Sequence, residues 1–455
     1  MKILGNNSFF TNAFKNFNKE KQIYSGIGNN IPNSSLPKEV ETLIIGGGLL
    51  GLSTAIRLAK DNRDVVVVDM NKIGEGASGR SGGQLWPGYE MSFSEMEEKF
   101  GSNLTVKTWN LTDETLLEIH ERINTREDKC DFVPGLLLAS KTKNQTKFIK
   151  EEARIMKEKG MDFVTFIPKE EMNNYVNTNV YSNGILFKGN IEGRQYGHIN
   201  PLKYVQTTAL VASGLGVKLV ENTKVEGVYK MKNSKYRIVT SKGEIIVKNV
   251  IFATGADFIR PKGVDYNIIP RTHIPVQTII IATEPIAESI VDKIIPSRVC
   301  FCDAGSVAMN YVALIPDKDK EKYYRLTFGG ADTLMQLETA LEIPRLEKEM
   351  REMFPQLDEH KVKIDKTWGG DCDMSRTTTP IIANPQDGIY YAAGFSGQGM
   401  VNTALYGTAI AERIIGENCE KFEILEKINS HKYSNNSLIA WLQASEMVFL
   451  KGVNE

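Results

Sequence analysis

One stretch, residues 41–69, constrains the fold of this chain more than any other. It begins with a short apolar strand and continues with three glycines in the pattern G-x-G-x-x-G: Gly46, Gly48 and Gly51. Apolar residues then recur at helical spacing, and a β-branched run, Val65–Val68, ends at an acidic residue, Asp69. Strand, tight turn, helix and strand in this order form the unit that holds the phosphates of a dinucleotide. We therefore predict a Rossmann-like nucleotide-binding domain.

Each glycine of this pattern has its own physical role. Gly46 permits the sharp turn, Gly48 lets backbone N–H groups approach a pyrophosphate at the helix N-terminus, and Gly51 lets the helix pack closely on the strand. Asp69 would accept hydrogen bonds from a ribose, and its charge disfavours a 2′-phosphate there. The alternative is an ordinary βαβ turn that binds no nucleotide. From this stretch we expect cofactor contacts at Gly46, Gly48, Leu49, Leu50, Gly51, Asp69 and Met70.

Composition and charge argue against several classes of function. The chain has 455 residues, enough for two or three domains, and its 55 basic and 56 acidic side chains create no overall field for nucleic acid or an acidic membrane surface. No apolar run approaches the roughly 18 residues that cross a bilayer. The five cysteines lack the spacing of a disulfide framework or a zinc site, so we expect no metal and a reducing compartment, the cytoplasm. Cys300-x-Cys302 could be a redox pair, but buried thiols fit better.

A second glycine-rich segment follows the fingerprint. Small residues surround one arginine between positions 74 and 84, so this backbone can bend closely around a flat or charged ligand. The alternative is a flexible surface loop, but the segment runs on into Leu85-Trp86-Pro87, which favours a cofactor-covering role. Its expected cofactor contacts are Gly76, Ala77, Ser78, Gly79, Arg80, Gly82, Gly83 and Gln84.

The stretches GGGLLGLSTAIRLA, VVVVD and GASGRSGGQ together resemble the flavin-dependent D-amino-acid oxidase-like family, which includes glycine and sarcosine oxidases. Within that family the likeness is greatest to the gamma-glutamylputrescine oxidases, which have Asn where this chain has Ser81. The resemblance extends from about residue 40 to about residue 430. It continues in DFVPGL at 131–136, GHINPL at 197–202, YRLTFGG at 324–330, WGG at 368–370 and GFSGQG at 394–399.

The resemblance implies an α/β fold, α+β overall, with a discontinuous Rossmann-like FAD-binding domain and a substrate domain built on a mixed or antiparallel sheet. The FAD-binding domain would comprise residues 41–94, 196–270 and 361–420, and the substrate domain residues 95–195 and 271–360. Outside the resemblance, residues 1–40 are rich in Asn and Lys and contain several phenylalanines, so we expect an N-terminal arm on the surface of the body, with a membrane-surface helix as the alternative, and residues 421–455 are expected to form a C-terminal helical tail. Further expected cofactor residues are Val225, Thr254, Gly255, Trp368, Gly394, Gly397, Gln398, Gly399 and Met400.

Local patterns add expectations for individual elements. Apolar periodicity and helix start and stop signals predict helices over 106–123, 145–159, 201–214, 333–353 and 400–415. Four short strands, 219–220, 225–229, 236–240 and 244–247, are expected to form a small antiparallel set, with a separate buried strand at 250–256. The chain is expected to return to the cofactor domain at 362–368, and Trp441 and Phe449 to lie on a tail helix packed against the body.

The resemblance also suggests how the flavin is held and which residues act. Trp368 stands where sarcosine-oxidase relatives have a cysteine bonded to the flavin, so we expect noncovalent FAD although Cys372 is four residues away. Relatives commonly have His where this chain has Gln398, at the start of a helix that would face the flavin pyrimidine and stabilise negative charge there. His198 could be a base or could only orient the helix entry. Arg325 could assist oxygen, hold a substrate carboxylate or form an internal ion pair.

Three functions remain open at this point. The first is FAD-dependent oxidation of an amine C–N bond to an imine, with O2 as acceptor and H2O2 as product, and with gamma-glutamylputrescine or a similar amine or amino acid as the leading substrate. The second keeps this fold but passes electrons to a quinone or protein acceptor, as a dehydrogenase. The third is a flavin-binding module without turnover, which the neutral charge balance makes a poor candidate for binding nucleic acid.

Overall fold

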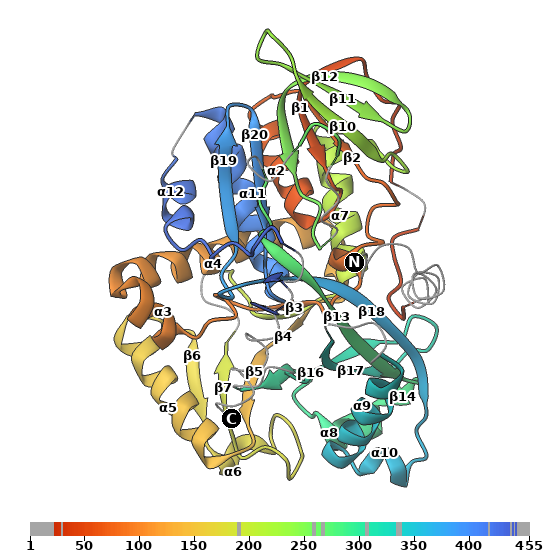
Figure 1. Cartoon of the computed structure of the whole chain (residues 1–455). Coiled ribbons are helices and arrows are strands. Elements are labelled where there is room, and N and C mark those ends of the chain that lie inside the picture. The colour runs from red at the N-terminus through yellow and green to blue at the C-terminus, as the bar shows by residue number, and fades with distance from the viewer. Residues whose placement is uncertain are drawn as a thin grey trace.

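We analysed a computed structural model of the chain. It describes residues 22–28, 31–188, 193–256, 261–264, 269–304, 309–333, 339–416, 419–436, 439–440 and 442–443, with side chains at 331–333 and 339–341 excepted. Two large sheets form two layered bodies, one above the other in Figure 1, and two long strands, β13 and β18, cross between them. This arrangement agrees with the predicted α/β fold with a second, mixed sheet.

The first sheet is parallel at its centre. Five parallel strands follow the order β20-β12-β1-β2-β9, with β19 added antiparallel to β20. A pair of antiparallel strands, β10 and β11, joins the first half of β12. The bounds are β1 Glu39–Ile45, β2 Val65–Val68, β9 Lys218–Val220, β10 Val225–Lys230, β11 Tyr236–Thr240, β12 Gly243–Phe252, β19 Ile381–Gln386 and β20 Ile389–Ala393.

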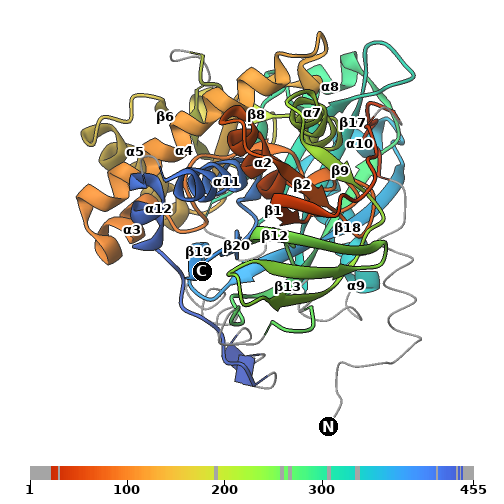
Figure 2. The ribbon, with the colours of Figure 1, turned by 90° about the horizontal axis from the view of Figure 1, so that it is seen from above.

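Alternate residues of the central strands belong to two different cores. Ile44, Val67 and Ile251 face three helices that lie side by side on one face of the sheet in Figure 2: α2 (Leu49–Lys60), α7 (Pro201–Gly214) and α11 (Gly399–Ile415). Leu43 and Val66 face the opposite way, toward apolar residues of β10, β11 and β12. Because both faces are covered, β2 is valine at all four positions, and all four are buried.

The structure differs from two of the predictions for the strands of this sheet. β9 does not join the small antiparallel set but pairs in parallel with β2, at the edge of the central sheet. The strands expected at 244–247 and 250–256 are one continuous strand, β12. Polar Asn249 interrupts the apolar pattern there, yet it is buried, and its amide donates to the Thr42 hydroxyl on β1 at 3.2 Å. An internal hydrogen bond therefore allows a polar residue within a buried strand.

The second sheet is mixed and runs in the order β18-β13-β17-β16-β15-β5-β7-β6, with β14 beside β17. Its strands are β5 Leu136–Ser140, β6 Val164–Ile167, β7 Asn183–Phe187, β13 His273–Thr283, β14 Ile286–Ala287, β15 Cys300–Asp303, β16 Tyr311–Pro316, β17 Tyr323–Thr333 and β18 Ile364–Ser375. β18 pairs antiparallel with β13 along its whole length. The chain therefore regains the first sheet only at β19, later than the predicted return at 362–368.

The remaining elements surround and connect the two sheets. A small sheet of β3 (Gln84–Leu85), β8 (Gly197–His198) and β4 (Val133–Pro134) lies between them. Helix α4 comes from the segment predicted for the substrate domain, yet it packs against α11 and α7 of the first body. The other helices are α3 Phe93–Phe100, α4 Ser102–Ile123, α5 Lys143–Glu158, α6 Lys169–Met172, α8 Glu288–Ile294, α9 Thr339–Met353, α10 Gln356–Glu359 and α12 Glu420–Glu426.

The two ends of the chain are only partly described. Of the predicted N-terminal arm, residues 1–21 lie outside the described residues, and 22–28 lie against the body through contacts given below. Of the predicted tail, Tyr433 and Ala440 are buried against Ile274, whereas Trp441 and Phe449 lie outside the described residues. None of the described helices combines the length and the apolar character that a membrane crossing requires.

Candidate functional site

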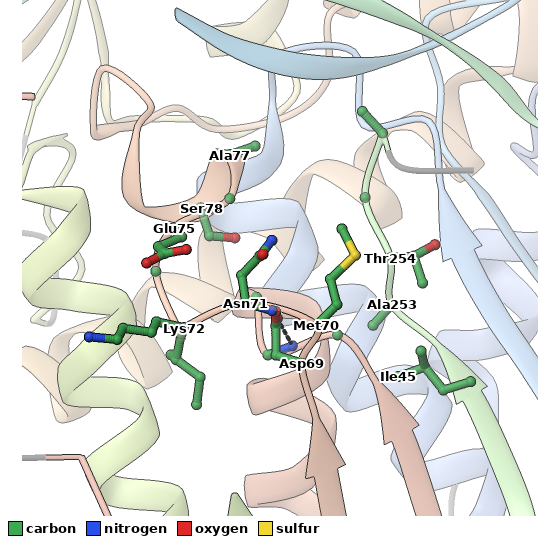
Figure 3. Close-up of a pocket in the computed structure, with 18 of the residues that line it drawn as sticks. Ile45, Asp69, Met70, Asn71, Lys72, Glu75, Ala77, Ser78, Ala253 and Thr254 are labelled. Carbon is green, nitrogen blue, oxygen red and sulfur yellow. Dashed lines mark hydrogen bonds between the residues drawn. The ribbon is translucent and has the colours of Figure 1, made fainter. Parts of the chain in front are cut away.

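A cavity of about 1090 Å³ opens at the C-terminal ends of β1, β2 and β12. Figure 3 shows its wall: Asp69, Met70 and Asn71 follow β2, Ala77 and Ser78 lie across from them, and Ala253 and Thr254 follow β12. This edge of a parallel sheet is where such folds bind nucleotides. Of the predicted cofactor residues, those that line the cavity are Gly46, Gly48, Asp69, Met70, Gly76, Ala77, Ser78, Arg80, Val225, Thr254 and Gly255.

Two glycines of the turn lie too close to neighbouring backbone atoms to carry a side chain. At Gly46 (φ +113°) an added Cβ would lie 2.2 Å from the Ala253 carbonyl oxygen, and at Gly51 it would lie 2.1 Å from the Gly46 carbonyl oxygen. Gly48 has φ −79°, which any residue can adopt, but an added Cβ there would lie 3.0 Å from the Ser78 hydroxyl. The contacts at Gly46 and Gly51 fit the predicted tight turn and close helix packing, and the role of Gly48 toward a pyrophosphate stays a prediction.

The N-terminus of α2 points into this space. Leu52 makes the first bond of the helix, to the Gly48 carbonyl at 3.0 Å, so the amides before it need other acceptors. The Leu49 amide donates to the Ser78 hydroxyl at 3.1 Å. Ser78 belongs to a short 3₁₀ turn, Ala77–Gly79, and thus joins the second glycine-rich segment to the first. Backbone donors and a dipole end suited to a phosphate are in place.

Asp69 lies at the end of β2 as predicted, and its carboxylate is held by two backbone amides. Oδ2 accepts from Gly47 at 2.8 Å and Oδ1 accepts from Asn71 at 2.8 Å. Burial raises the pKa of Asp69 to about 6, although both amides favour its charged form. Gly47, the middle glycine of the turn, was not predicted as a cavity residue. A Cβ there would come 2.9 Å from Ile73 and 3.3 Å from Asp69 Oδ2.

The segment from 74 to 84 is tied to β18 and α11. Arg80 Nε donates to the Gly369 carbonyl at 2.7 Å, and the buried Trp368 donates from Nε1 to the Arg80 carbonyl at 3.0 Å. The Ser81 hydroxyl contacts the sulfur of Met400 at 3.2 Å. These bonds bring the start of α11 next to the cavity wall. They also show that the segment is an ordered part of the site.

The turn before α11 has an unusual backbone. Gly394, Ser396 and Gly397 have φ values of +80°, +51° and +86°. A buried acid on β18, Asp373, holds this turn: its Oδ2 accepts from the Gly394 amide at 2.7 Å, and its carbonyl accepts from the Ser396 amide at 3.2 Å. The Ser396 hydroxyl accepts in turn from the Ser375 amide at 3.0 Å. The strained turn is therefore fixed by β18 rather than by its own sequence.

The other predicted cofactor residues do not line the cavity. Gln84 pairs with His198 in the small sheet, and Trp368 supports Arg80 from β18. The others in this group are Leu49, Leu50, Gly51, Gly79, Gly82, Gly83, Gly394, Gly397, Gln398, Gly399 and Met400. Cavity residues that sequence reasoning missed include Gln22, Tyr24, Gly47, Asn71, Lys72, Glu75, Gln206, Lys224, Gly370 and Asp371. Three of these residues lay inside motifs that the sequence had already marked: Gly47 in the glycine turn, Glu75 in the 74–84 segment and Gly370 in WGG at 368–370.

The three candidate catalytic side chains lie in different surroundings. His198 is 1% exposed and donates from Nε2 to the Leu314 carbonyl at 2.9 Å, and burial lowers its pKa to about 4. Gln398 caps α11, and its amide donates to Glu90 Oε2 at 3.2 Å. Arg325 was expected beside the cofactor, but it does not line the cavity. Its guanidinium donates to Asp317 at 3.0 Å, to the Thr283 carbonyl at 3.1 Å and to Asp365, which is the internal ion-pair arrangement.

The fold and the site define a class: a two-sheet oxidoreductase architecture whose parallel sheet binds a dinucleotide. The family model described as DAO, FAD dependent oxidoreductase, matches residues 41–413. The chain is 32% identical over 391 residues to a probable oxidoreductase OrdL of Haemophilus influenzae, covering 86% of each chain. It is 28% identical over 400 residues to gamma-glutamylputrescine oxidoreductase of Escherichia coli, covering 86% of this chain and 87% of that one.

A solved structure shares the fold. Glycine oxidase from Geobacillus kaustophilus superposes with a TM-score of 0.68 at 18% identity, over 84% of this chain and 96% of that one. The chain belongs to the DAO family of FAD-dependent oxidoreductases, and its cofactor is FAD. The glycine cradle, the amides of α2 and the acid at the end of β2 fit the phosphates and ribose of that cofactor.

We predict that the flavin is held without a covalent bond. The family resemblance leads us to expect Trp368 at the position of the attachment cysteine, and all five cysteines lie in the described part of the chain, none of them in a disulfide. Cys372, on β18, pairs with Val276 on β13. Acid precipitation should release the yellow colour into the supernatant. Colour that stays in the pellet of the parent but not of Cys372→Ala would show a covalent link and contradict this prediction.

We also predict that Asp373 positions the turn before α11. Asp373→Ala leaves the buried Gly394 amide without its acceptor, and one such loss costs about 1–3 kcal/mol. The rate of flavin reduction by a working amine should fall about 10-fold, measured by rapid mixing. Asp373→Asn keeps an acceptor oxygen and should recover most of that rate. Equal losses in both variants would mean that the carboxylate acts in some other way.

Proposed function

We propose that this chain oxidises the C–N bond of a small amine to an imine, with O2 as electron acceptor. The substrate carbon gives up one hydrogen with two electrons, a hydride equivalent, and the nitrogen gives up one proton as C–N becomes C=N. Water then hydrolyses the imine to an aldehyde and an amine, and O2 takes up the electrons and two protons to become H2O2. Gamma-glutamylputrescine or a similar amine or amino acid is the leading substrate, and the cytoplasm the proposed compartment.

One observation supports this proposal more strongly than the alternative functions. The relative from Escherichia coli, named for its action on gamma-glutamylputrescine, matches 86% of this chain, including both the cofactor half and the substrate half. Within the site, Glu90 lies beside Gln398 at the start of α11. An amine is a cation in neutral water, and a carboxylate near the reacting end would favour its approach.

The protein itself contributes binding of the cofactor and electrostatic stabilisation of negative charge. FAD, when bound, supplies the electron-accepting chemistry. The N-terminus of α11 provides fixed dipoles that favour negative charge nearby, and the turn at 394–397 fixes the direction in which they point. The buried His198 donates from Nε2 to the Leu314 carbonyl and does not line the cavity, which favours an orienting role over that of a base.

The test is turnover of an amine panel in air with peroxide and aldehyde both measured. We expect one peroxide per aldehyde with gamma-glutamylputrescine or a close analogue. Aldehyde that forms only when a quinone or dye is added would instead indicate a dehydrogenase. A yellow protein that no amine reduces would contradict the proposal and leave a binding module.

A further inference from the structure

A short segment before the family domain reaches the cofactor cavity. Residues 22–28, called the strap below, precede the family match at 41–413, and they form neither helix nor strand. Yet Tyr24 is only 5% exposed, and Gln22 and Tyr24 both line the cavity. A segment without regular backbone pairing is held in place by side-chain contacts and local hydrogen bonds, so these contacts show what the strap is built against.

At one end the strap contacts the second glycine-rich segment. The Tyr24 hydroxyl donates to the Ser81 carbonyl at 2.8 Å. Its ring stands edge-on to Trp368, with centroids 5.5 Å apart and planes at 78°. Because Trp368 donates to the Arg80 carbonyl, the two aromatic side chains hold adjacent peptide groups of the wall. Such edge-to-face pairs add to the stability that burial gives.

At its other end the strap is fixed to α7. The Asn200 amide, at the N-cap of that helix, donates to the Ser25 carbonyl at 3.1 Å. The Ile27 amide donates to Gln206 Oε1 at 2.8 Å, and Gln206 itself lines the cavity. The strap thus joins two walls of the cavity, the 74–84 segment and α7.

We propose that the strap is part of the FAD site and that Tyr24 is a residue that retains the cofactor. The family domain supplies the phosphate cradle and the ribose acid, and this chain adds a wall from outside that domain. A segment held by few backbone bonds opens more easily than a sheet or helix. The cofactor would therefore leave fastest when the strap detaches, and weakening its anchors should speed release.

The measurement is FAD release from the holoenzyme after dilution, followed by the rise in flavin fluorescence without any substrate. Tyr24→Ala should speed release about 10-fold or more, a change equal to about 1.4 kcal/mol. Tyr24→Phe, which loses only the bond to Ser81, should lie between this variant and the parent. Tyr323→Ala removes an exposed tyrosine from β17 in the second sheet and should release FAD at the parent rate.

A second variant tests the other anchor. Ile27→Pro removes the backbone N–H that donates to Gln206 Oε1 and keeps the Tyr24 side chain. Faster FAD release from this variant would support the role of the strap independently of Tyr24. If Tyr24→Ala also lowers the melting temperature of the apoprotein, the FAD release rates of Tyr24→Phe and Ile27→Pro decide whether the strap retains the cofactor. Parent release rates in both would overturn the proposal and make the strap a surface covering. Because no amine is used, this result does not depend on the proposed substrate.

Discussion

Replacing Gly48 with valine should give a folded chain that purifies without yellow colour. The parent should carry about one FAD per chain. At Gly48 the backbone angles suit any residue, so valine strains no backbone dihedral. Its Cβ would lie 3.0 Å from the Ser78 hydroxyl, and its methyl groups would occupy the space in front of the α2 amides. FAD affinity should fall about 100-fold or more, equal to about 2.7 kcal/mol.

Absorbance and FAD titration of the purified variant check this expectation. Gly214→Val is the matched control, because a Cβ at Gly214 meets nothing within 4 Å and this position ends α7, away from the cavity lining. The control should stay yellow with an unchanged melting temperature. A yellow, active Gly48→Val would mean that this turn does not hold the phosphates. Recovery of NAD(H) from the parent would contradict the assignment of FAD.

Replacing Gly397 with valine should act on the reaction rather than on flavin binding. Gly397 has φ +86°, which valine adopts only with strain, and no atom lies within 4 Å of an added Cβ. The side chain therefore fits, but the backbone of the turn before α11 must change. The flavin reduction rate should fall about 10²-fold, the loss typical of one misplaced oxyanion-type donor. The affinity for sulfite, which also depends on stabilising negative charge on the flavin, should fall with it.

Two controls separate backbone from side chain. Gly399→Ala changes the first residue of α11, where an added Cβ has only ordinary contact with Thr403 at 3.8 Å, and it should keep the parent rate. Gln398→His restores the residue common in relatives and should remain active, because its side chain points to Glu90 and its backbone is unchanged. If Gly397→Val binds FAD and is reduced at the parent rate, α11 is only a packing element.

Local patterns predicted the parts of the site that depend on local spacing. The glycine turn, Asp69 and helices α2, α7 and α11 each follow from residues a few positions apart, and the structure has each of them within a few residues of its predicted position. The partner of β9 could not be predicted, since a three-residue strand with two apolar residues carries no information about which neighbour it pairs with. β12 was divided in two because the buried Asn249 interrupts its apolar run.

Long-range contacts explain the remaining misses. Arg325 was placed by analogy, but its environment is set by Asp317 and Asp365, which the sequence separates by 8 and 40 positions from it. Tyr24 lies in a stretch with no periodic pattern, and its contacts in the site are with residues far along the chain, Ser81, 57 residues away, and Trp368. Asp373 had no signature either, because its function depends on a turn 21 residues later in the chain.

In the proposed reaction, FAD in this site takes electrons from an amine. The direct measurement is to mix the purified yellow protein with gamma-glutamylputrescine and related amines under nitrogen and to follow the flavin absorbance. We expect rapid bleaching with at least one of these amines, followed by return of the colour and formation of peroxide when O2 is admitted. Flavin that dithionite bleaches but that none of the amines or amino acids reduces would contradict the account.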